Sequence, residues 1–253
     1  MTDPRERFSD RVDDYVRFRP AYPDSLVAAL FADSAEAAAL TIADIGSGTG
    51  IFTRLLLERG ARVYAVEPNA AMRTAAESHL ADYGNFTSVD GGAEDTGLAD
   101  NSIDLVTAAQ AFHWFNNRQS LAEFQRILKT DGRLALVWNN RNQRQPFQRA
   151  YEALLHEHAP EYGKVNHMNL SDDDIAGFFA PGQMQLCRFG YRQRLDFGSL
   201  LGRLKSSSYC PHENSTDYQR LTAALRDLFD QHASQGLLDF EYESLLYLGA
   251  IKR

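Results

Sequence analysis

The residues best suited to chemistry lie in one short stretch, Asp44-Ile45-Gly46-Ser47-Gly48-Thr49-Gly50, which combines a carboxylate with three alternating glycines. Glycines in such a turn allow φ > 0 and a close approach of the backbone to a ligand. A buried strand is predicted before the turn and a helix after it, beginning near Ile51. The first N–H groups of that helix and its positive dipole end would face the ligand. The turn is therefore predicted to bind something anionic or rich in lone pairs.

The spacing of the glycines distinguishes between nucleotide ligands. A dinucleotide-binding G-x-G-x-x-G turn would need its third glycine at position 51, which is Ile51. A P-loop would need Gly-Lys-Ser/Thr, and no lysine follows the turn. A second strand, 62–66, ends on the acidic Glu67, where a carboxylate can accept hydrogen bonds from a ribose diol. A nucleoside with a short charged tail satisfies both features.

The elements that must position these residues alternate between strand and helix over 41–140, which predicts a parallel sheet covered on both faces. Strands are predicted near 41–45, 62–67, 86–90, 103–109 and 133–139, and helices near 50–59, 69–82 and 117–129. Gly60 and Gly132 are expected to end helices. Ligands of open parallel sheets bind at the carboxyl ends of the strands, where the turns 46–50, 67–69, 91–95, 110–115 and 139–142 lie.

Both flanks of this core also show helical and strand patterns. Ahead of it, Val12, Tyr15 and Val16 predict an amphipathic helix that ends before Pro20, and a second helix begins at Pro23. Beyond it we expect a helix at 145–158, a polar excursion at 159–177, a strand at 186–197 and helices at 198–205 and 216–232. The last strand, 240–251, is expected to be one half of a terminal hairpin.

Five stretches of the chain carry a family resemblance: the turn at 44–50, Glu67-Pro68-Asn69, Arg19-Pro20-Ala21-Tyr22-Pro23, Gln110-Ala111-Phe112-His113-Trp114-Phe115 and, late in the chain, Ser206-Ser207-Ser208-Tyr209. The sequence resembles the class I S-adenosylmethionine-dependent methyltransferases, and among them the small-molecule, trans-aconitate methyltransferase-like group of methyltransferase type 11. The resemblance implies S-adenosyl-L-methionine as cofactor, S-adenosyl-L-homocysteine as its product, and a small-molecule methyl acceptor.

The expected fold is α/β: a Rossmann-like, doubly wound, seven-stranded sheet that is mostly parallel with an antiparallel C-terminal strand, helices on both faces and a small helical cap. We expect one methyltransferase domain over 1–253. Its parts are an N-terminal helical cap (1–40), a cofactor-binding core (41–140), a helical insertion (141–182), and the C-terminal part of the sheet with the substrate side (183–253).

The resemblance assigns cofactor contacts to the strand ends. Asp44 is expected to meet the amino group of the cofactor, and Glu67 the ribose hydroxyls. Their alternatives are capping of the turn and a solvent-facing acid. The adenine is expected against Ala93 and Glu94, because Gly92 stands where many relatives carry an adenine-binding Asp; Glu94 is equally well read as a plain loop acid. The expected cofactor-binding set is Asp44, Gly46, Ser47, Gly48, Gly50, Glu67, Pro68, Ala93, Glu94 and Gln110.

His113 is the candidate general base, because imidazole titrates near neutral pH. The alternative is a structural histidine, and a carboxylate acceptor would need no base at all. An arginine would matter for such an acceptor, since a guanidinium binds a carboxylate bidentately. The expected substrate-binding set is Tyr15, Arg19, Tyr22, Trp114, Arg141 and Tyr209.

Composition excludes several other classes. A net charge of −8 argues against a nucleic-acid substrate, which usually requires a basic face. Cys187 and Cys210 have neither metal-site spacing nor a disulfide pattern, so no metal is expected. The N-terminus lacks an apolar signal segment and no apolar run is long enough for a membrane span. We therefore expect a cytoplasmic protein without membrane contact, whose oligomeric state the sequence leaves open.

The leading hypothesis is methyl transfer from S-adenosylmethionine to a small molecule by in-line displacement, with a carboxylic acid as the acceptor suggested by the family. One alternative is a non-catalytic protein that binds the same cofactor. Another is a methyltransferase that acts on a protein or nucleic acid, although the Asn/Asp-Pro-Pro-aromatic signature of base methylation is absent after the fourth strand. A nicotinamide oxidoreductase is disfavoured by Ile51.

Overall fold

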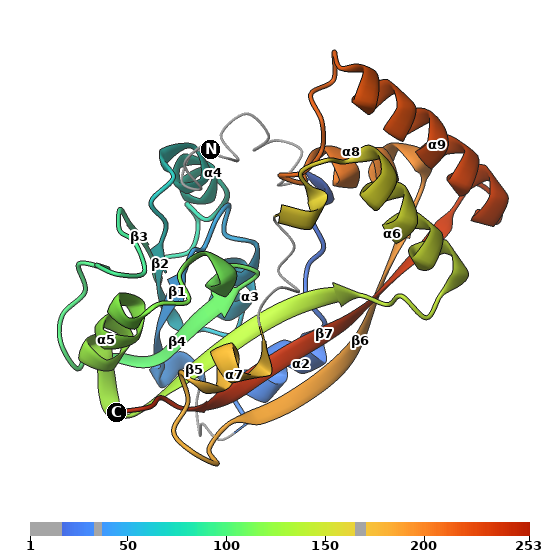
Figure 1. Cartoon of the computed structure of the whole chain (residues 1–253). Helices are drawn as coiled ribbons and strands as arrows, with labels where there is room; N and C mark the ends of the chain where they lie inside the picture. Colours follow the sequence, from blue (N-terminus) through green and yellow to red (C-terminus); the bar gives the residue numbers. More distant parts are fainter. Residues whose placement is uncertain (1–16, 33–36, 165–170) are drawn as a thin grey trace.

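The predicted sheet is present in the computed structural model, which describes residues 17–32, 37–164 and 171–253. Within them a seven-stranded sheet has the order β3-β2-β1-β4-β5-β7-β6 (Figure 1). Among these strands, β7 runs in the direction opposite to the other six. The order reverses between β1 and β4, which creates the crevice where doubly wound folds bind ligands. The strands are β1 (Thr41–Ile45), β2 (Arg62–Val66), β3 (Phe86–Val89), β4 (Ile103–Ala109), β5 (Leu128–Arg141), β6 (Gln185–Leu195) and β7 (Leu238–Ala250).

Helices cover both faces of this sheet, as the sequence predicts. On one face, α2 (Asp24–Leu30), α3 (Ile51–Glu58) and α4 (Ala70–His79) share a hydrophobic core with β1 and β2. On the other, α5 (Arg118–Ile127) and α7 (Asp172–Ala176) contribute Phe124, Ile127 and Ile175 to a second core. The α/β, Rossmann-like fold class is therefore confirmed.

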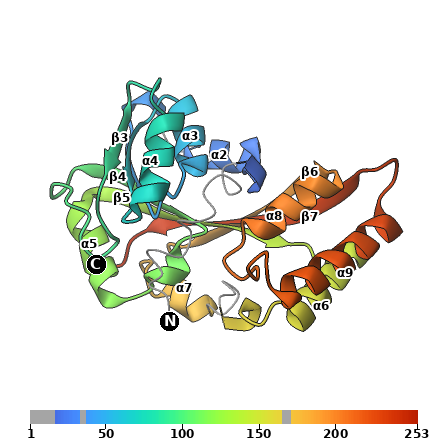
Figure 2. The same ribbon diagram turned by 90° about the horizontal axis from the view of Figure 1, so that it is seen from above.

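The strands β5, β7 and β6 are much longer than the others and extend away from this doubly wound part (Figures 1 and 2). Their far portion carries α6 (Pro146–His158), α8 (Phe197–Lys205) and α9 (Thr216–His232), which build a third hydrophobic core with Phe240 and Tyr242 of β7. A short helical turn, η4 (Tyr162–Lys164), joins the same core through Tyr162. The predicted inward face of α6 is confirmed, since Phe147, Tyr151, Leu154 and Leu155 are buried.

Two predictions need correction, and a third falls outside the described residues. Gly132 does not end a helix, because α5 ends at Ile127 and β5 begins at Leu128; a Cβ at Gly132 would lie 2.8 Å from Leu128 Cδ2, so the residue permits a close fold of the strand at an irregular register. The last two strands are not a hairpin, because α8 and α9 intervene between β6 and β7. The helix expected at Val12, Tyr15 and Val16 lies outside the described residues. Gly60, with φ +89°, does follow the end of α3 as predicted.

Candidate active site

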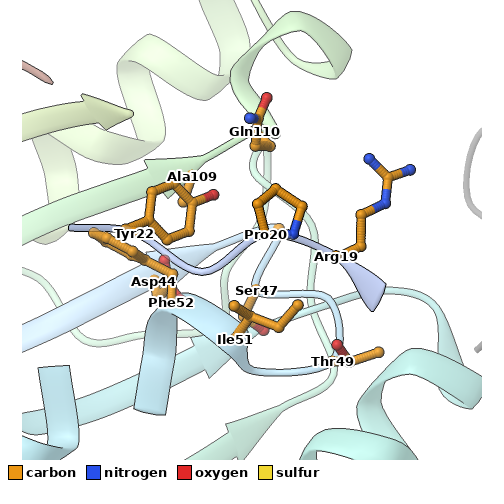
Figure 3. Close-up of a pocket in the computed structure, with 11 residues that line it drawn as sticks. Arg19, Pro20, Tyr22, Asp44, Ser47, Thr49, Ile51, Phe52, Ala109 and Gln110 are labelled. Atoms are coloured by element: carbon orange, nitrogen blue, oxygen red, sulfur yellow. The ribbon is translucent and has the colours of Figure 1, made fainter. Parts of the chain in front are cut away.

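A pocket lies at the carboxyl ends of β1 and β4, at the point where the strand order reverses (Figure 3). Three segments far apart in the sequence form it: the chain just before α2, the glycine turn with the first turn of α3, and the end of β4. Its lining residues are Arg19, Pro20, Tyr22, Asp44, Gly46, Ser47, Thr49, Ile51, Phe52, Ala109 and Gln110. Six of these are residues that the sequence assigns to the cofactor or the acceptor: Arg19, Tyr22, Asp44, Gly46, Ser47 and Gln110.

The glycine turn has the backbone that its sequence requires. Gly46, Gly48 and Gly50 have φ of +66°, +58° and +81°, which L-residues with a Cβ adopt at a cost. The amides of Gly46 and Ser47 donate to Val66 O at 2.9 and 3.2 Å, which ties the turn to the end of β2. A Cβ at Gly46 would lie 2.7 Å from Ala111 Cβ, whereas one at Gly48 would have no atom within 4 Å. Gly48 therefore faces open space.

Asp44 is a buried carboxylate at the end of β1. Its Oδ2 accepts a hydrogen bond from Thr53 Oγ1 at 2.6 Å, and its Oδ1 accepts one from Thr107 Oγ1 at 2.8 Å. Burial raises the pKa of this carboxyl from 3.8 to about 6, against the lowering effect of the two hydroxyls. A carboxylate held in this way, on a pocket wall and with no cation beside it among the described contacts, is suited to receive a positively charged ligand group.

Glu67 connects the second strand to the same turn. Its Oε2 accepts from the amide of Gly48 and its Oε1 from the amide of Asn69, both at 2.9 Å. The side chain is buried rather than solvent-facing, and that burial raises its pKa. Each carboxylate oxygen retains a second lone pair, so acceptance from a diol remains compatible with these contacts. Pro68 follows directly and is half-buried.

Thr49 is a pocket residue that the sequence did not single out. It is 3% exposed, and its Oγ1 has no hydrogen-bond partner among the described residues. Buried hydroxyls are normally paired, so an unpaired one on a pocket wall indicates a polar ligand. Together with the space beside Gly48 and the carboxylate of Asp44, it fits the amino-acid end of a nucleoside cofactor. A hydroxyl between two glycines of the turn was the available sequence signal.

The segment before α2 closes the pocket from the opposite side. Asn139 Nδ2 donates to Ala21 O at 2.9 Å, and Arg19 Nη2 donates to Ser206 O at 2.8 Å. The rings of Tyr22 and Phe52 meet edge to face at 4.9 Å. Arg19 and Tyr22 thus lie beside the glycine turn, as Figure 3 shows. Tyr15 lies outside the described residues.

Gln110 follows β4 with φ +57°, an unfavourable conformation for a residue with a side chain. Its Nε2 donates to Asn139 O at 3.3 Å. Strain of this kind persists where neighbouring structure fixes it, which is common at ligand sites.

In the loop predicted for adenine, Gly92 and Asp95 form a bridge, Ala93 is buried, and the exposed Glu94 accepts from Asn117 Nδ2 at 2.8 Å. These loop residues are not part of the pocket lining.

The aromatic residues after β4 divide into core and surface. Phe112 is fully buried and packs edge to face against Phe178 at 4.7 Å and Trp138 at 6.1 Å, so core packing explains it. Trp114 is 36% exposed, with its ring 4.7 Å from that of His113. Neither lines the pocket.

His113 is expected to be neutral near neutral pH. Burial lowers the pKa of its imidazole from 6.5 to about 4, because the charged form loses hydration. We expect NMR titration of the carbon-bound imidazole protons, assigned with His113→Gln, to show no transition for this residue between about pH 8 and pH 5. A midpoint near its ordinary value would contradict this and restore His113 as a base poised near neutrality.

Arg141 and Tyr209 lie beyond the pocket, in the third core. Arg141 Nη2 is 2.9 Å from Glu152 Oε2 and also donates to Tyr162, and Nη1 lies 3.4 Å from the Tyr209 hydroxyl. The positive charge of Arg141 is therefore already paired. Neither Arg141 nor Tyr209 lines the pocket, whereas Arg19 and Tyr22, which the sequence groups with them, do.

A family model described as a methyltransferase domain matches residues 43–136, which run from β1 into β5 and include the turn, Asp44 and Glu67. This stretch of the chain is therefore similar to a methyltransferase domain. The residues present fit S-adenosylmethionine, the cofactor that the sequence resemblance implies: a buried carboxylate, an unpaired hydroxyl and an open glycine turn lie at one strand edge.

Several curated proteins are similar to this methyltransferase domain. An uncharacterized methyltransferase of Mycobacterium tuberculosis is 39% identical over 137 residues, which cover 54% of each chain. An uncharacterized methyltransferase-like protein of Schizosaccharomyces pombe is 28% identical over 228 residues, 87% of this chain and 85% of the relative. The chain spans about half the length of the first curated relatives it matches.

Solved structures share the fold of this chain. A protein of Anaeromyxobacter dehalogenans, provisionally assigned as a type II methyltransferase, superposes with a TM-score of 0.65 at 24% identity, covering 92% of this chain and 98% of that one. The YcgJ protein of Bacillus subtilis gives a TM-score of 0.57 at 20% identity, with 91% and 99% covered. At these identities the likeness concerns the fold.

Two further properties concern the described part of the chain. None of its helices has the length and apolar character needed to cross a membrane. No group of three or more His, Cys, Asp or Glu side chains within the described ranges is arranged to hold a metal ion.

Proposed function

We propose that the protein transfers a methyl group from S-adenosylmethionine to a small acidic molecule by in-line displacement. The observation that carries this proposal is the pocket at the switch point of a methyltransferase domain, where the glycine turn, Asp44 and the unpaired hydroxyl of Thr49 meet. When bound, the cofactor supplies an electrophilic methyl group on a sulfonium sulfur.

The chain's own residues bind and orient in this proposal. Asp44 receives the ammonium group of the cofactor, and Thr49 supplies a hydrogen bond to its amino-acid end. Glu67 accepts from the ribose hydroxyls while it holds the turn through Gly48. Tyr22 and Phe52 exclude water from the pocket, which favours displacement at carbon over side reactions.

The acceptor follows from what surrounds the pocket. Arg19 lines it with a guanidinium, which suits a carboxylate or another anion. The depressed pKa of His113 disfavours a base-dependent acceptor, and a carboxylate requires no base. The net charge of −8 disfavours nucleic acid. A small acid therefore agrees with each of these observations.

Calorimetric titration of S-adenosylhomocysteine tests the cofactor site. We expect micromolar binding, weakened roughly tenfold or more by Glu67→Gln, because the substituted amide turns a donor toward a backbone N–H and repels it. Glu77→Gln is the matched control, since Glu77 is an exposed acid that accepts from Ser88. Absence of binding to folded wild-type protein would sink the proposal.

Turnover separates the enzyme from a non-catalytic binding protein. Production of S-adenosylhomocysteine is followed while small carboxylic acids, amines and thiols are supplied one at a time. Formation that depends on an acid supports the proposed acceptor class. Binding of the cofactor product without turnover on any acceptor would favour the non-catalytic alternative.

A further inference from the structure

Arg203, on α8, is a buried cation without an anion beside it. Its side chain is 5% exposed, and its guanidinium carbon lies 4.7 Å from the centre of the Phe240 ring and 5.2 Å from that of Tyr242. The Tyr242 hydroxyl is hydrogen-bonded to this guanidinium, but within the described residues no carboxylate lies within 4.0 Å of it and its Nε has no hydrogen-bond acceptor. Burying a charge is unfavourable unless it is paired, so a guanidinium left in this state indicates a missing anion.

Arg141 shows how the same environment treats a charge that is paired. Arg141 and Tyr242 are direct partners on β5 and β7, so their side chains share one face of the sheet, and Arg203 stacks on that tyrosine. Glu152 neutralises Arg141 at 2.9 Å. Two buried guanidiniums therefore lie near Tyr242 with one carboxylate between them, which leaves an excess of positive charge.

The pKa of Tyr209, which lies beside these two arginines, reflects the same excess of positive charge. Burial alone would raise the pKa of the Tyr209 hydroxyl, but the positive charges of Arg141, Arg203 and Arg19 lower it instead. The hydroxyl lies 3.4 Å from Arg141 Nη1. Three guanidiniums from three separate segments thus act on one hydroxyl group.

This cationic cluster is connected to the pocket through the segment before α2. Arg19 lines the pocket and donates to Ser206 O at 2.8 Å, and Ser206 Oγ donates to the carbonyl oxygen of Arg203 at 2.7 Å. A Cβ at Gly202 would lie 2.3 Å from the ring of Phe18, so α8 packs directly on the segment that closes the pocket. The cluster therefore lies directly behind the segment that closes the pocket.

We propose that Arg203 binds an anionic group of the methyl acceptor, a carboxylate or a phosphate, at the end of the molecule away from the methylated atom. The inference rests on the proposed function. Lone pairs that accept from a guanidinium are poor nucleophiles, so a group held at Arg203 anchors the acceptor rather than receiving the methyl group. Arg203 is then a residue that determines specificity for the acceptor. Arg141, which is already paired with Glu152, has a structural role beside it.

The test uses the full chain saturated with S-adenosylhomocysteine and two probe anions, succinate and inorganic phosphate, titrated by calorimetry. We expect one probe to bind wild-type protein and Arg203→Met to weaken it by about tenfold or more. The probe that binds identifies the group as carboxylate or phosphate. Arg203→Lys keeps the charge but loses the planar fork, and we expect several-fold weakening. Arg188→Met, at an exposed arginine paired with Glu243, is the control that leaves binding unchanged.

In the titrations, two outcomes overturn the inference: neither anion binds wild-type protein, or both Arg203 variants bind the probe as well as wild type does. The affinity for S-adenosylhomocysteine, measured on the same samples, reports on the proposed function separately. Thermal unfolding without ligand adds an independent readout. Arg203→Met should melt above wild type, because an apolar side chain of similar length replaces an uncompensated buried charge. A lower melting temperature would show that the charge is satisfied within the fold and would also contradict the inference.

Discussion

Asp44→Asn is expected to remove measurable binding of S-adenosylhomocysteine and, at the same time, to make the unliganded protein more stable above about pH 6. The loss of binding follows from removal of the only carboxylate that lines the pocket among the described residues. The gain in stability follows from burial, which raises the pKa of Asp44 to about 6 from 3.8. A raised pKa means that the folded state binds the proton more tightly than the unfolded state, so the ionised carboxylate destabilises the fold.

The pH dependence gives this prediction its sign. Stability of the wild-type protein should fall as pH rises from about 4 to about 6, because the proton is lost from the folded state only at the upper end of that window. Above it the cost is complete, on the order of 2–3 kcal/mol. We expect denaturant titrations to show Asp44→Asn exceeding wild type by that amount near pH 8 and matching it near pH 4. A variant less stable than wild type near pH 8 would mean that the hydrogen bonds from Thr53 and Thr107 outweigh the burial cost.

Gly48→Ala and Gly46→Ala are expected to separate cofactor binding from folding. Both residues have positive φ, so each alanine costs about 1–2 kcal/mol of backbone strain. At Gly46 the added Cβ would also meet Ala111 Cβ at 2.7 Å, which should raise the total loss to roughly 3 kcal/mol or more. At Gly48 the methyl group enters open space, where the cofactor is proposed to lie. We therefore expect Gly48→Ala to stay folded and to bind S-adenosylhomocysteine at least about thirtyfold more weakly.

Calorimetric affinity and urea midpoints measured on both variants test the pair. If Gly48→Ala binds S-adenosylhomocysteine as tightly as wild type does, the proposal that the cofactor occupies the space beside Gly48 is wrong. The expected separation also fails if the two variants lose equal stability, since only Gly46 has a neighbour at clash distance.

The features that could be predicted from sequence are those in which local chemistry determines the outcome. Three glycines, a preceding hydrophobic strand and Glu67 at the next strand end are close in sequence, and the bounds of β1, β2 and β4 agree with the pattern to within a residue. The bounds of α9 agree as well, because its apolar period and the cap at Ser215 are local. The prediction that Gly132 ends a helix is wrong, because glycine both ends helices and permits tight contacts within strands.

The residues that sequence could not rank differ only in their tertiary partners. The sequence alone does not distinguish the three arginines at 19, 141 and 203. In the structure, Arg141 forms an ion pair with Glu152 and Arg19 donates to the carbonyl oxygen of Ser206. Arg203 is buried and has no carboxylate within 4.0 Å among the described residues. Thr49 and Thr53 are likewise both hydroxyls near the turn, but only Thr53 is paired with Asp44. Long-range packing decides which polar group is left for a ligand.

The length of β5 has a consequence for how such a protein can diversify. The stretch that matches the methyltransferase family ends at residue 136, five residues before β5 itself ends at Arg141. The third core is built on that overhang and on the facing portions of β7 and β6 (Figure 2). Because β5 is parallel to β4 and β1, the overhang continues from the same edge of the sheet at which the glycine turn lies. Substitutions on the overhang would therefore change what stands beside that edge, while β1 and α3, which hold the glycine turn, keep their own packing.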